Sequence, residues 1–330
     1  MGRAVLHEGS FTAGPLAVEY RAIAPGGWEG PASLPLLLVL HGADSSAAIL
    51  DEQLELYDGL WSAGTFPDVV VACASTPTVG GFYIDWPAAP WETAVAEDFP
   101  RHLGERFGAD LDRIMLLGSS MGGYGALKIA FTDPGRFTAV AAMQPAVFPG
   151  EAMADVGPRN TLGVLRELHA AMAGGAGDKD AYDREHVVAR LRRNAAAVRG
   201  LPILIECGDN DSFNLHDGAE YLHRVLWDLD VSHDYRLVRG ADHVGSSRVP
   251  RERSAREFLA AALAARDRPD PQPPEAFRAW LAGGGAGAMP PVDFYSPEGA
   301  AALRLMLEPE RQAAAAQDPG ASRRYGSLGA

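Results

Sequence analysis

Short apolar runs alternate with longer amphipathic stretches over most of the chain, between about residues 15 and 266. Several runs are apolar throughout, which is typical of strands buried on both faces of a parallel sheet. The pattern predicts strands at 16–24, 35–40, 68–74, 113–117, 138–143, 202–207 and 233–238, with helices between them at 49–63, 92–107, 121–132, 215–229 and 251–265. This alternation favours an α/β fold with a mostly parallel central sheet and helices on both faces.

The alternation is interrupted after the strand at 138–143. Residues 146–200 hold two helical segments, near 161–173 and 182–198, joined by a glycine-rich loop. A segment of this length is too long for a plain connection, so we interpret it as a helical cap over the edge of the sheet. The alternative is that these helices pack on the sheet like the others.

A proline-rich, charged segment at 267–275 ends the repeating pattern. Such a composition resists both helix and strand. We therefore predict a catalytic domain at 1–266 and a Pro/Gly-rich linker with a C-terminal tail at 267–330. Helices are expected in the tail near 276–282 and 297–317, and no motif there carries chemistry.

The composition narrows the classes of partner. Hydrophobic residues make up 47% of the chain, which is enough for a sizeable core, and the formal charge of −14 without a Lys/Arg-rich run argues against nucleic acid. Purely apolar stretches such as 36–40 are far shorter than the roughly 20 residues that cross a bilayer. We see no secretory signal, and Cys73 and Cys207 both fall in strand-like runs. We expect a cytoplasmic protein without a membrane span, and its oligomeric state, homo-oligomers included, stays open.

The central chemical signal is the sequence GSSMG at 118–122, which matches the G-x-S-x-G motif with Ser120 in the middle. The motif lies between a predicted strand and a predicted helix, an arrangement that places a serine hydroxyl at the tip of a sharp turn. Glycines on either side avoid collisions in such a turn. The N–H of Met121, at the helix start, would face negative charge that develops on a substrate. The alternative is a purely structural glycine turn.

A serine nucleophile needs a base, and the base needs a group that orients it. His243 follows the strand at 233–238 in a glycine-containing loop, and Asp209 and Asp211 follow the strand at 202–207. Both loops lie at carboxyl ends of strands, where ligands bind in open α/β sheets. The residues alone leave the two aspartates open as the acid. The histidines in predicted helices are expected to face solvent; they are residues 102, 169, 186, 216 and 223.

A second donor for an oxyanion is expected after the strand at 35–40. The loop there begins with His41, Gly42 and Ala43, whose small residues allow close approach of the backbone. The N–H of Ala43 is the candidate donor, and Gly42 permits the turn. His41 is expected to be structural more often than catalytic, although it and Gly42 would border the substrate pocket.

These motifs resemble the esterase D or putative-esterase family, which includes S-formylglutathione hydrolases, feruloyl and tributyrin esterases and antigen 85 mycolyltransferases. The likeness covers about residues 16–259 and is carried by LLLVLHG, FYIDW, GSSMGGYGALKIAF, GDNDSF and DHVGSS. It implies an α/β-hydrolase fold with its helical insertion after the sixth strand. One departure is HGADSS at 41–46, where S-formylglutathione hydrolases carry a longer stretch, which argues against that substrate.

The resemblance also implies roles for single residues. The family's acid precedes a short unit that ends in Phe, and DSF at 211–213 matches it, so Asp211 is preferred over Asp209. Ser120 would be the nucleophile and His243 the base. Asp85 and Trp86 would line the substrate pocket, unless they are a capping aspartate beside a packed aromatic.

The activity implied is that of a serine carboxylesterase. It would hydrolyse small to medium acyl esters through an acyl-enzyme, with a small-molecule ester as its partner and without metal or cofactor. The alternatives are an acyltransferase that passes the acyl group to an alcohol or sugar hydroxyl and, more remotely, a non-catalytic binding protein on the same fold.

Overall fold

The computed structural model describes residues 3–27, 33–77, 81–174, 177–268 and 271–317. The chain divides into two compact units, Met1–Leu263 and Ala264–Ala330. The division falls within the last turns of helix α9 (Arg248–Arg266). Each unit is described by itself.

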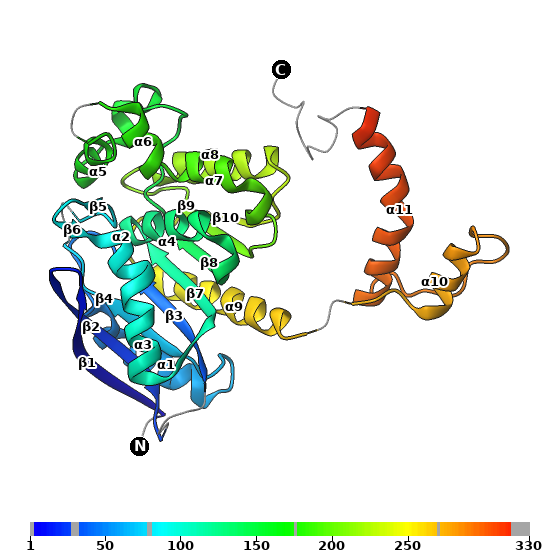
Figure 1. Ribbon diagram of the computed structural model, residues 1–330, viewed down its shortest axis with the longest axis horizontal. Coiled ribbons are helices and arrows are strands. Elements are labelled where there is room, and N and C mark those ends of the chain that lie inside the picture. Colours follow the sequence, from blue (N-terminus) through cyan, green and yellow to red (C-terminus); the bar gives the residue numbers. More distant parts are fainter. Residues whose placement is uncertain (1–2, 28–32, 78–80, 175–176, 269–270, 318–330) are drawn as a thin grey trace. The chain divides into compact units, whose positions relative to one another are not determined.

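The first unit is built on an eight-stranded sheet in the order β1-β2-β4-β3-β7-β8-β9-β10 (Figure 1). From β4 to β10 neighbouring strands are parallel, whereas β1 and β2 form an antiparallel edge. The mostly parallel sheet is thus confirmed, and β1 is a strand that the pattern did not predict. The strands are β1 Ala4–Ala13, β2 Leu16–Pro25, β3 Leu34–Leu40, β4 Val70–Ala74, β7 Ala109–Ser119, β8 Phe137–Met143, β9 Ile203–Gly208 and β10 Asp234–Val238. A separate small hairpin pairs β5 (Asp85–Trp86) with β6 (Ala89–Pro90).

Helices cover both faces of the sheet (Figure 1). Strand β3 shows why, because Leu36, Leu38 and Leu40 belong to one core and Leu37 and Val39 to the other. This alternation follows from the two-residue period of a strand. The first core includes side chains of α3 (Phe99–Phe107), α4 (Met121–Thr132) and α8 (Leu215–Asp228), and the second includes side chains of α1 (Ile49–Ser62) and α9. A short helix α2 (Trp91–Thr93) and a π-helical turn at Ala94–Asp98 precede α3.

The insertion leaves the sheet after β8, the sixth strand of the large sheet along the chain, and returns at β9. It carries α5 (Val164–Met172), α6 (Lys179–Glu185) and α7 (Val187–Val198). One helix was predicted where α6 and α7 lie, but His186 has an extended backbone (φ −79°, ψ 122°) that separates them. Helix α7 packs against α4, α6 contacts α7, and α5 contacts α6, so α5 and α6 lie farther from the sheet than α4 (Figure 1). The expectation that helical histidines face solvent is wrong for His169 and His186, which are buried.

The second unit contains α10 (Glu275–Ala282) and α11 (Pro297–Gln317). Phe277, Ala301 and Ala302 are buried there. Part of the predicted linker, 269–270, and the end of the tail from 318 lie outside the described residues. Among the helices of the described ranges, none has the length and apolar character needed to span a bilayer.

Candidate active site

Ser120 occupies a strained turn between β7 and α4. Its backbone has φ 58° and ψ −119°, a conformation that non-glycine residues rarely adopt. A side chain at Gly118 would overlap the carbonyl of Gly122, and one at Gly122 would overlap the carbonyl of Leu40. The glycines on both sides of the serine are therefore required by close backbone packing, as the motif predicted.

The turn is fastened to the end of β8. The N–H of Ser120 donates to the Met143 carbonyl at 3.0 Å. The Ser120 carbonyl accepts from the N–H groups of Tyr124 and Ala146, each at 3.0 Å. These bonds hold the backbone of Ser120 in a fixed position at the carboxyl edge of the sheet.

His243 and Asp211 form a close pair from the loops after β10 and β9. His243 Nδ1 lies 2.8 Å from Asp211 Oδ2, and the Asp211 side chain is fully buried. The other carboxylate oxygen accepts from the N–H groups of Phe213 (2.9 Å) and Leu215 (3.3 Å). Because the carboxylate accepts, Nδ1 carries the proton and Nε2 is left as the basic nitrogen. The Phe213 ring packs edge-on against the imidazole, with ring centroids 4.8 Å apart.

Asp209 has a different role. It is exposed, and its carboxylate accepts from the Gly240 N–H at 2.6 Å, which closes the loop after β10. The structure therefore brings Asp211, and not Asp209, to His243.

Asp242 joins the two loops that hold this pair, and no pattern in the sequence singled it out. Its Oδ1 accepts from the N–H and the hydroxyl of Ser212 (2.9 and 2.5 Å) and from the N–H of His243 (2.6 Å). These hydrogen bonds, first of all the one from the Ser212 hydroxyl, lower the pKa of the Asp242 carboxyl. Asp242 thus links the backbone of the base to the residue that follows the acid.

Ser120 and His243 are brought to the same edge of the sheet through Gln144. The Gln144 amide nitrogen lies 2.9 Å from Ser119 Oγ and 3.5 Å from the His243 carbonyl oxygen. The hydrogen bonds of the described residues do not include one between Ser120 Oγ and His243. Such bonds are often long in serine hydrolases without substrate.

The two candidate oxyanion donors lie beside the serine. A Cβ added to Gly42 would stand 3.5 Å from Ser120 Cβ, so the loop after β3 passes next to the nucleophile. Ala43 follows in that loop, and Met121 opens α4. Within the described chain neither amide has a recorded acceptor. Both N–H groups are therefore free to meet a substrate oxygen.

His41 supports this loop from inside the protein. It is fully buried; its Nδ1 donates to the Gly42 carbonyl at 2.8 Å, and its Nε2 accepts from the Thr76 N–H at 3.1 Å. Burial lowers the pKa of His41, in keeping with the unprotonated Nε2 that accepts from Thr76. Its contacts are those of a structural residue, as expected for this position.

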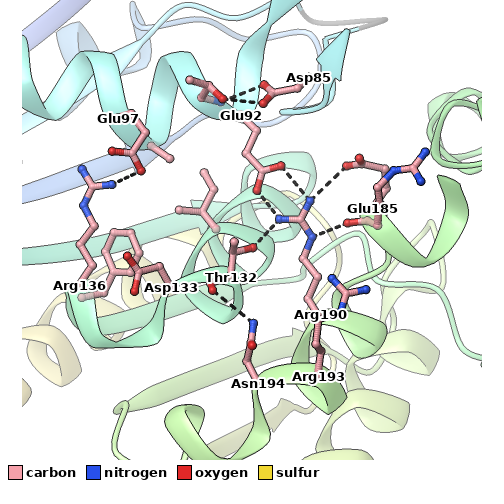
Figure 2. Close-up of a pocket in the computed structure, with 15 residues that line it drawn as sticks. Asp85, Glu92, Glu97, Thr132, Asp133, Arg136, Glu185, Arg190, Arg193 and Asn194 are labelled. Carbon is pink, nitrogen blue, oxygen red and sulfur yellow. Dashed lines mark hydrogen bonds and ion pairs between the residues drawn. The ribbon is translucent and has the colours of Figure 1, made fainter. Parts of the chain in front are cut away.

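Within the described ranges, no hydrogen bond, ion pair or ring contact joins Asp85 or Trp86 to Ser120 or His243. Asp85 accepts from the N–H and hydroxyl of Thr93 at 2.9 and 2.6 Å, as a capping aspartate does. It lines a cavity of about 510 Å³ whose other walls come from α2, the π-helical turn that follows it, α4 and the residues after it, α6 and α7 (Figure 2). None of Ser120, Asp211 and His243 lines this cavity. Trp86 is half-buried against the first core.

Charged side chains at this cavity, with Lys128 beside them, connect α6 and α7 of the insertion to α2 and α4; Figure 2 shows Glu92, Glu185 and Arg190. Arg190 of α7 donates to both carboxylate oxygens of Glu92, and Lys128 of α4 lies 3.1 Å from Glu92. Glu185 also pairs with Lys128. Burial alone would raise the pKa of Glu92, but the attraction of Lys128 and Arg190 outweighs it and lowers that pKa. The network is self-neutralising and anchors α7 to α4.

No group of three or more His, Cys, Asp and Glu side chains in the described part of the chain is arranged to hold a metal ion. Cys73 and Cys207 are free thiols in the interior. Burial raises the pKa of the Cys73 thiol to about 12, so it is an unreactive core residue.

Comparison with known proteins gives the family. A family model described as "Putative esterase" matches residues 19–244. The chain belongs to this esterase family. The S-formylglutathione hydrolase of Paracoccus denitrificans is 31% identical over 171 residues, which are 49% of this chain and 55% of that protein. The matched part therefore spans little more than half of this relative.

Solved esterase structures share the fold. A ferulic acid esterase superposes with a TM-score of 0.65 at 18% identity, over 80% of this chain and 100% of that one. An S-formylglutathione hydrolase from Agrobacterium tumefaciens gives 0.63 at 23% identity, over 80% and 96%. At these identities the likeness concerns the fold alone, and it confirms the predicted α/β-hydrolase architecture.

Proposed function

We propose that the protein is a serine carboxylesterase that hydrolyses small to medium acyl esters, with Ser120, His243 and Asp211 as its catalytic triad. The observation that carries this proposal is the His243–Asp211 pair, 2.8 Å apart, in loops beside the strained turn that presents Ser120. Membership of the esterase family supports the same reaction class. The two buried free thiols suit a reducing compartment, and we place the enzyme in the cytoplasm.

The reaction proceeds in two steps. Ser120 Oγ attacks the ester carbonyl carbon as its proton passes to His243 Nε2, and the N–H groups of Met121 and Ala43 stabilise the oxyanion. The carbon–alkoxide bond then breaks, and the alcohol leaves with the proton from His243. Water, deprotonated by Nε2, attacks the acyl-enzyme and releases the acid and free Ser120. Asp211 holds the imidazole in the required tautomer throughout.

A p-nitrophenyl ester series from acetate to octanoate, measured on the wild type and on Ser120→Ala, tests the proposal. Turnover should fall at least about a thousandfold in the variant. A fluorophosphonate probe should label the wild type, and peptide mapping should place the label on Ser120. Retention of most activity by Ser120→Ala would overturn the assignment. Product analysis with and without added alcohols distinguishes hydrolysis from acyl transfer, since a transferase passes most of the acyl group to the alcohol as a new ester, whereas a hydrolase releases mainly the free acid.

A further inference from the structure

A single buried arginine contacts three of the loops and strands around the candidate active site. Arg251 of α9 is 5% exposed. Its Nε donates to Glu206 Oε1 of β9 at 2.7 Å, its Nη1 donates to the Asp242 carbonyl at 3.2 Å, and its Nη2 donates to the side-chain oxygen of Gln144. The planar guanidinium thus uses all three of its nitrogens, which a lysine could not do.

Gln144 carries this contact onward to the nucleophile and the base. It is 3% exposed and directly follows β8, with an unusual φ of 34°. Its backbone N–H donates to the Glu206 carbonyl at 2.5 Å. Its side-chain nitrogen faces Ser119 Oγ and the His243 carbonyl. One amide therefore touches both the residue before Ser120 and the backbone of His243.

Stability alone is a weak reason for this arrangement. The side chains of Glu206 and Arg251 are 3% and 5% exposed, and a buried ion pair is often no more stabilising than apolar residues of the same size. What such a pair does provide is directed hydrogen bonds of fixed geometry. Here those bonds end on the loops that must be aligned for proton transfer from Ser120 to His243.

We propose that Arg251, Gln144 and Glu206 are positioning residues that hold the His243 loop against the Ser119–Ser120 turn. They touch neither substrate nor the reacting atoms. Their effect is to keep His243 Nε2 within reach of Ser120 Oγ. The inference rests on the proposed esterase function.

The test compares Arg251→Lys and Gln144→Met with a matched control, Arg256→Lys. Arg256 lies on the same helix, is 1% exposed and donates to Tyr57 (3.0 Å) and Gln53 (2.7 Å), away from the triad loops. Each variant is measured for kcat and KM on p-nitrophenyl butyrate, for the rate of fluorophosphonate labelling and for Tm. Glu206→Gln, which keeps an acceptor for Arg251, serves as the conservative variant.

Arg251→Lys and Gln144→Met should lower kcat about 10- to 100-fold with KM changed less than about threefold, because misalignment affects the chemical step more than binding. Labelling should slow in parallel, and Glu206→Gln should retain most of the activity. Arg256→Lys should lower Tm by about as much as Arg251→Lys does, but its kcat should stay within about threefold of the wild-type value. Equal kcat losses in the Arg251 and Arg256 variants, or unchanged kcat in Gln144→Met, would overturn the proposal. If Arg251→Lys does not fold, Gln144→Met decides. A wild type that neither turns over esters nor reacts with the probe would instead refute the esterase function itself.

Discussion

His243 Nδ1 lies 2.8 Å from Asp211 Oδ2, and the carboxylate has no exposed surface. The same carboxylate also accepts two backbone N–H groups of the loop that follows it. Asp211 is therefore fixed before any substrate binds, and the imidazole is oriented by a rigid partner.

Asp211→Asn should lower kcat about 10³- to 10⁴-fold, because an amide cannot hold the imidazole in the tautomer that leaves Nε2 basic. Asp209→Asn is the matched control from the same loop, and it should change kcat less than about fivefold, since its partner is the Gly240 N–H. Steady-state kinetics on p-nitrophenyl butyrate measure both. Comparable losses in the two variants would contradict the assignment of the acid.

Gly122→Ala should destabilise the protein by more than about 3 kcal/mol or prevent folding, because the added Cβ would overlap the Leu40 carbonyl and neither backbone can move freely. Gly135→Ala is the control, since a Cβ there meets open space, and it should change the free energy of unfolding by less than about 0.5 kcal/mol. Urea denaturation measures the difference. A stable, active Gly122→Ala protein would show that the turn is looser than described.

Glu92→Gln should cost about 3–5 kcal/mol of unfolding free energy, because it leaves buried Lys128 and Arg190 with an incomplete set of anionic partners. Glu97→Gln is the control. It removes a more exposed carboxylate, the ion-pair partner of Arg136, and should cost less than about 1 kcal/mol of unfolding free energy. The pKa of Glu92 is lowered in the folded protein, so its contribution is present above the ordinary carboxyl pKa and is lost as the pH falls through the folded value. The difference in free energy of unfolding between the wild type and Glu92→Gln should therefore become smaller at acidic pH.

His169→Phe should make the protein less sensitive to acid. His169 is buried against Phe148 and Tyr182, with ring centroids at 4.7 and 5.6 Å, and burial lowers its pKa from the ordinary value of 6.5. As the pH falls, the His169 side chain is protonated in the unfolded chain before it is protonated in the folded protein. The wild type therefore loses stability as the pH falls through 6.5 towards the folded pKa. The variant has no such group.

Urea denaturation of the wild type and His169→Phe between pH 8 and pH 5 measures this difference. A phenyl ring keeps the aromatic packing, and the His169 Nε2 has no hydrogen bond to lose within the described residues. The free energies of unfolding of the two proteins should therefore be similar at pH 8, and that of His169→Phe should be the higher one at pH 5. Parallel pH profiles would contradict the prediction.

The sequence was informative where apolar periodicity is strong. Strand β3 is apolar throughout and β8 is apolar except for Thr138, and both were predicted within one residue of their observed bounds. Strand β1 escaped prediction because polar residues such as Glu8, Ser10 and Thr12 interrupt it and only Phe11 and Ala13 are buried. The continuous helix expected at 92–107 contains a π-helical turn before Pro100, which has no N–H to donate to the preceding turn.

The candidate site was less evenly predictable. The G-x-S-x-G motif and the loops after two strands carried enough local signal for Ser120 and His243 to be singled out. The choice between Asp209 and Asp211 depends on which carboxylate turns inward, and periodicity does not encode this. Gln144 lies far along the chain from Asp242 and Arg251, and only the folded structure brings their hydrogen-bonding groups together.

Strands β8 and β9 are direct neighbours in the sheet, and the whole insertion leaves from one and returns to the other. The two ends of the insertion are therefore held next to each other by the hydrogen bonds that pair β8 with β9. Its length and composition can change without shifting the register of the strands that carry Ser120 and Asp211. Evolution of the insertion can thus change which substrates reach this edge of the sheet, while Ser120 and Asp211 keep their positions.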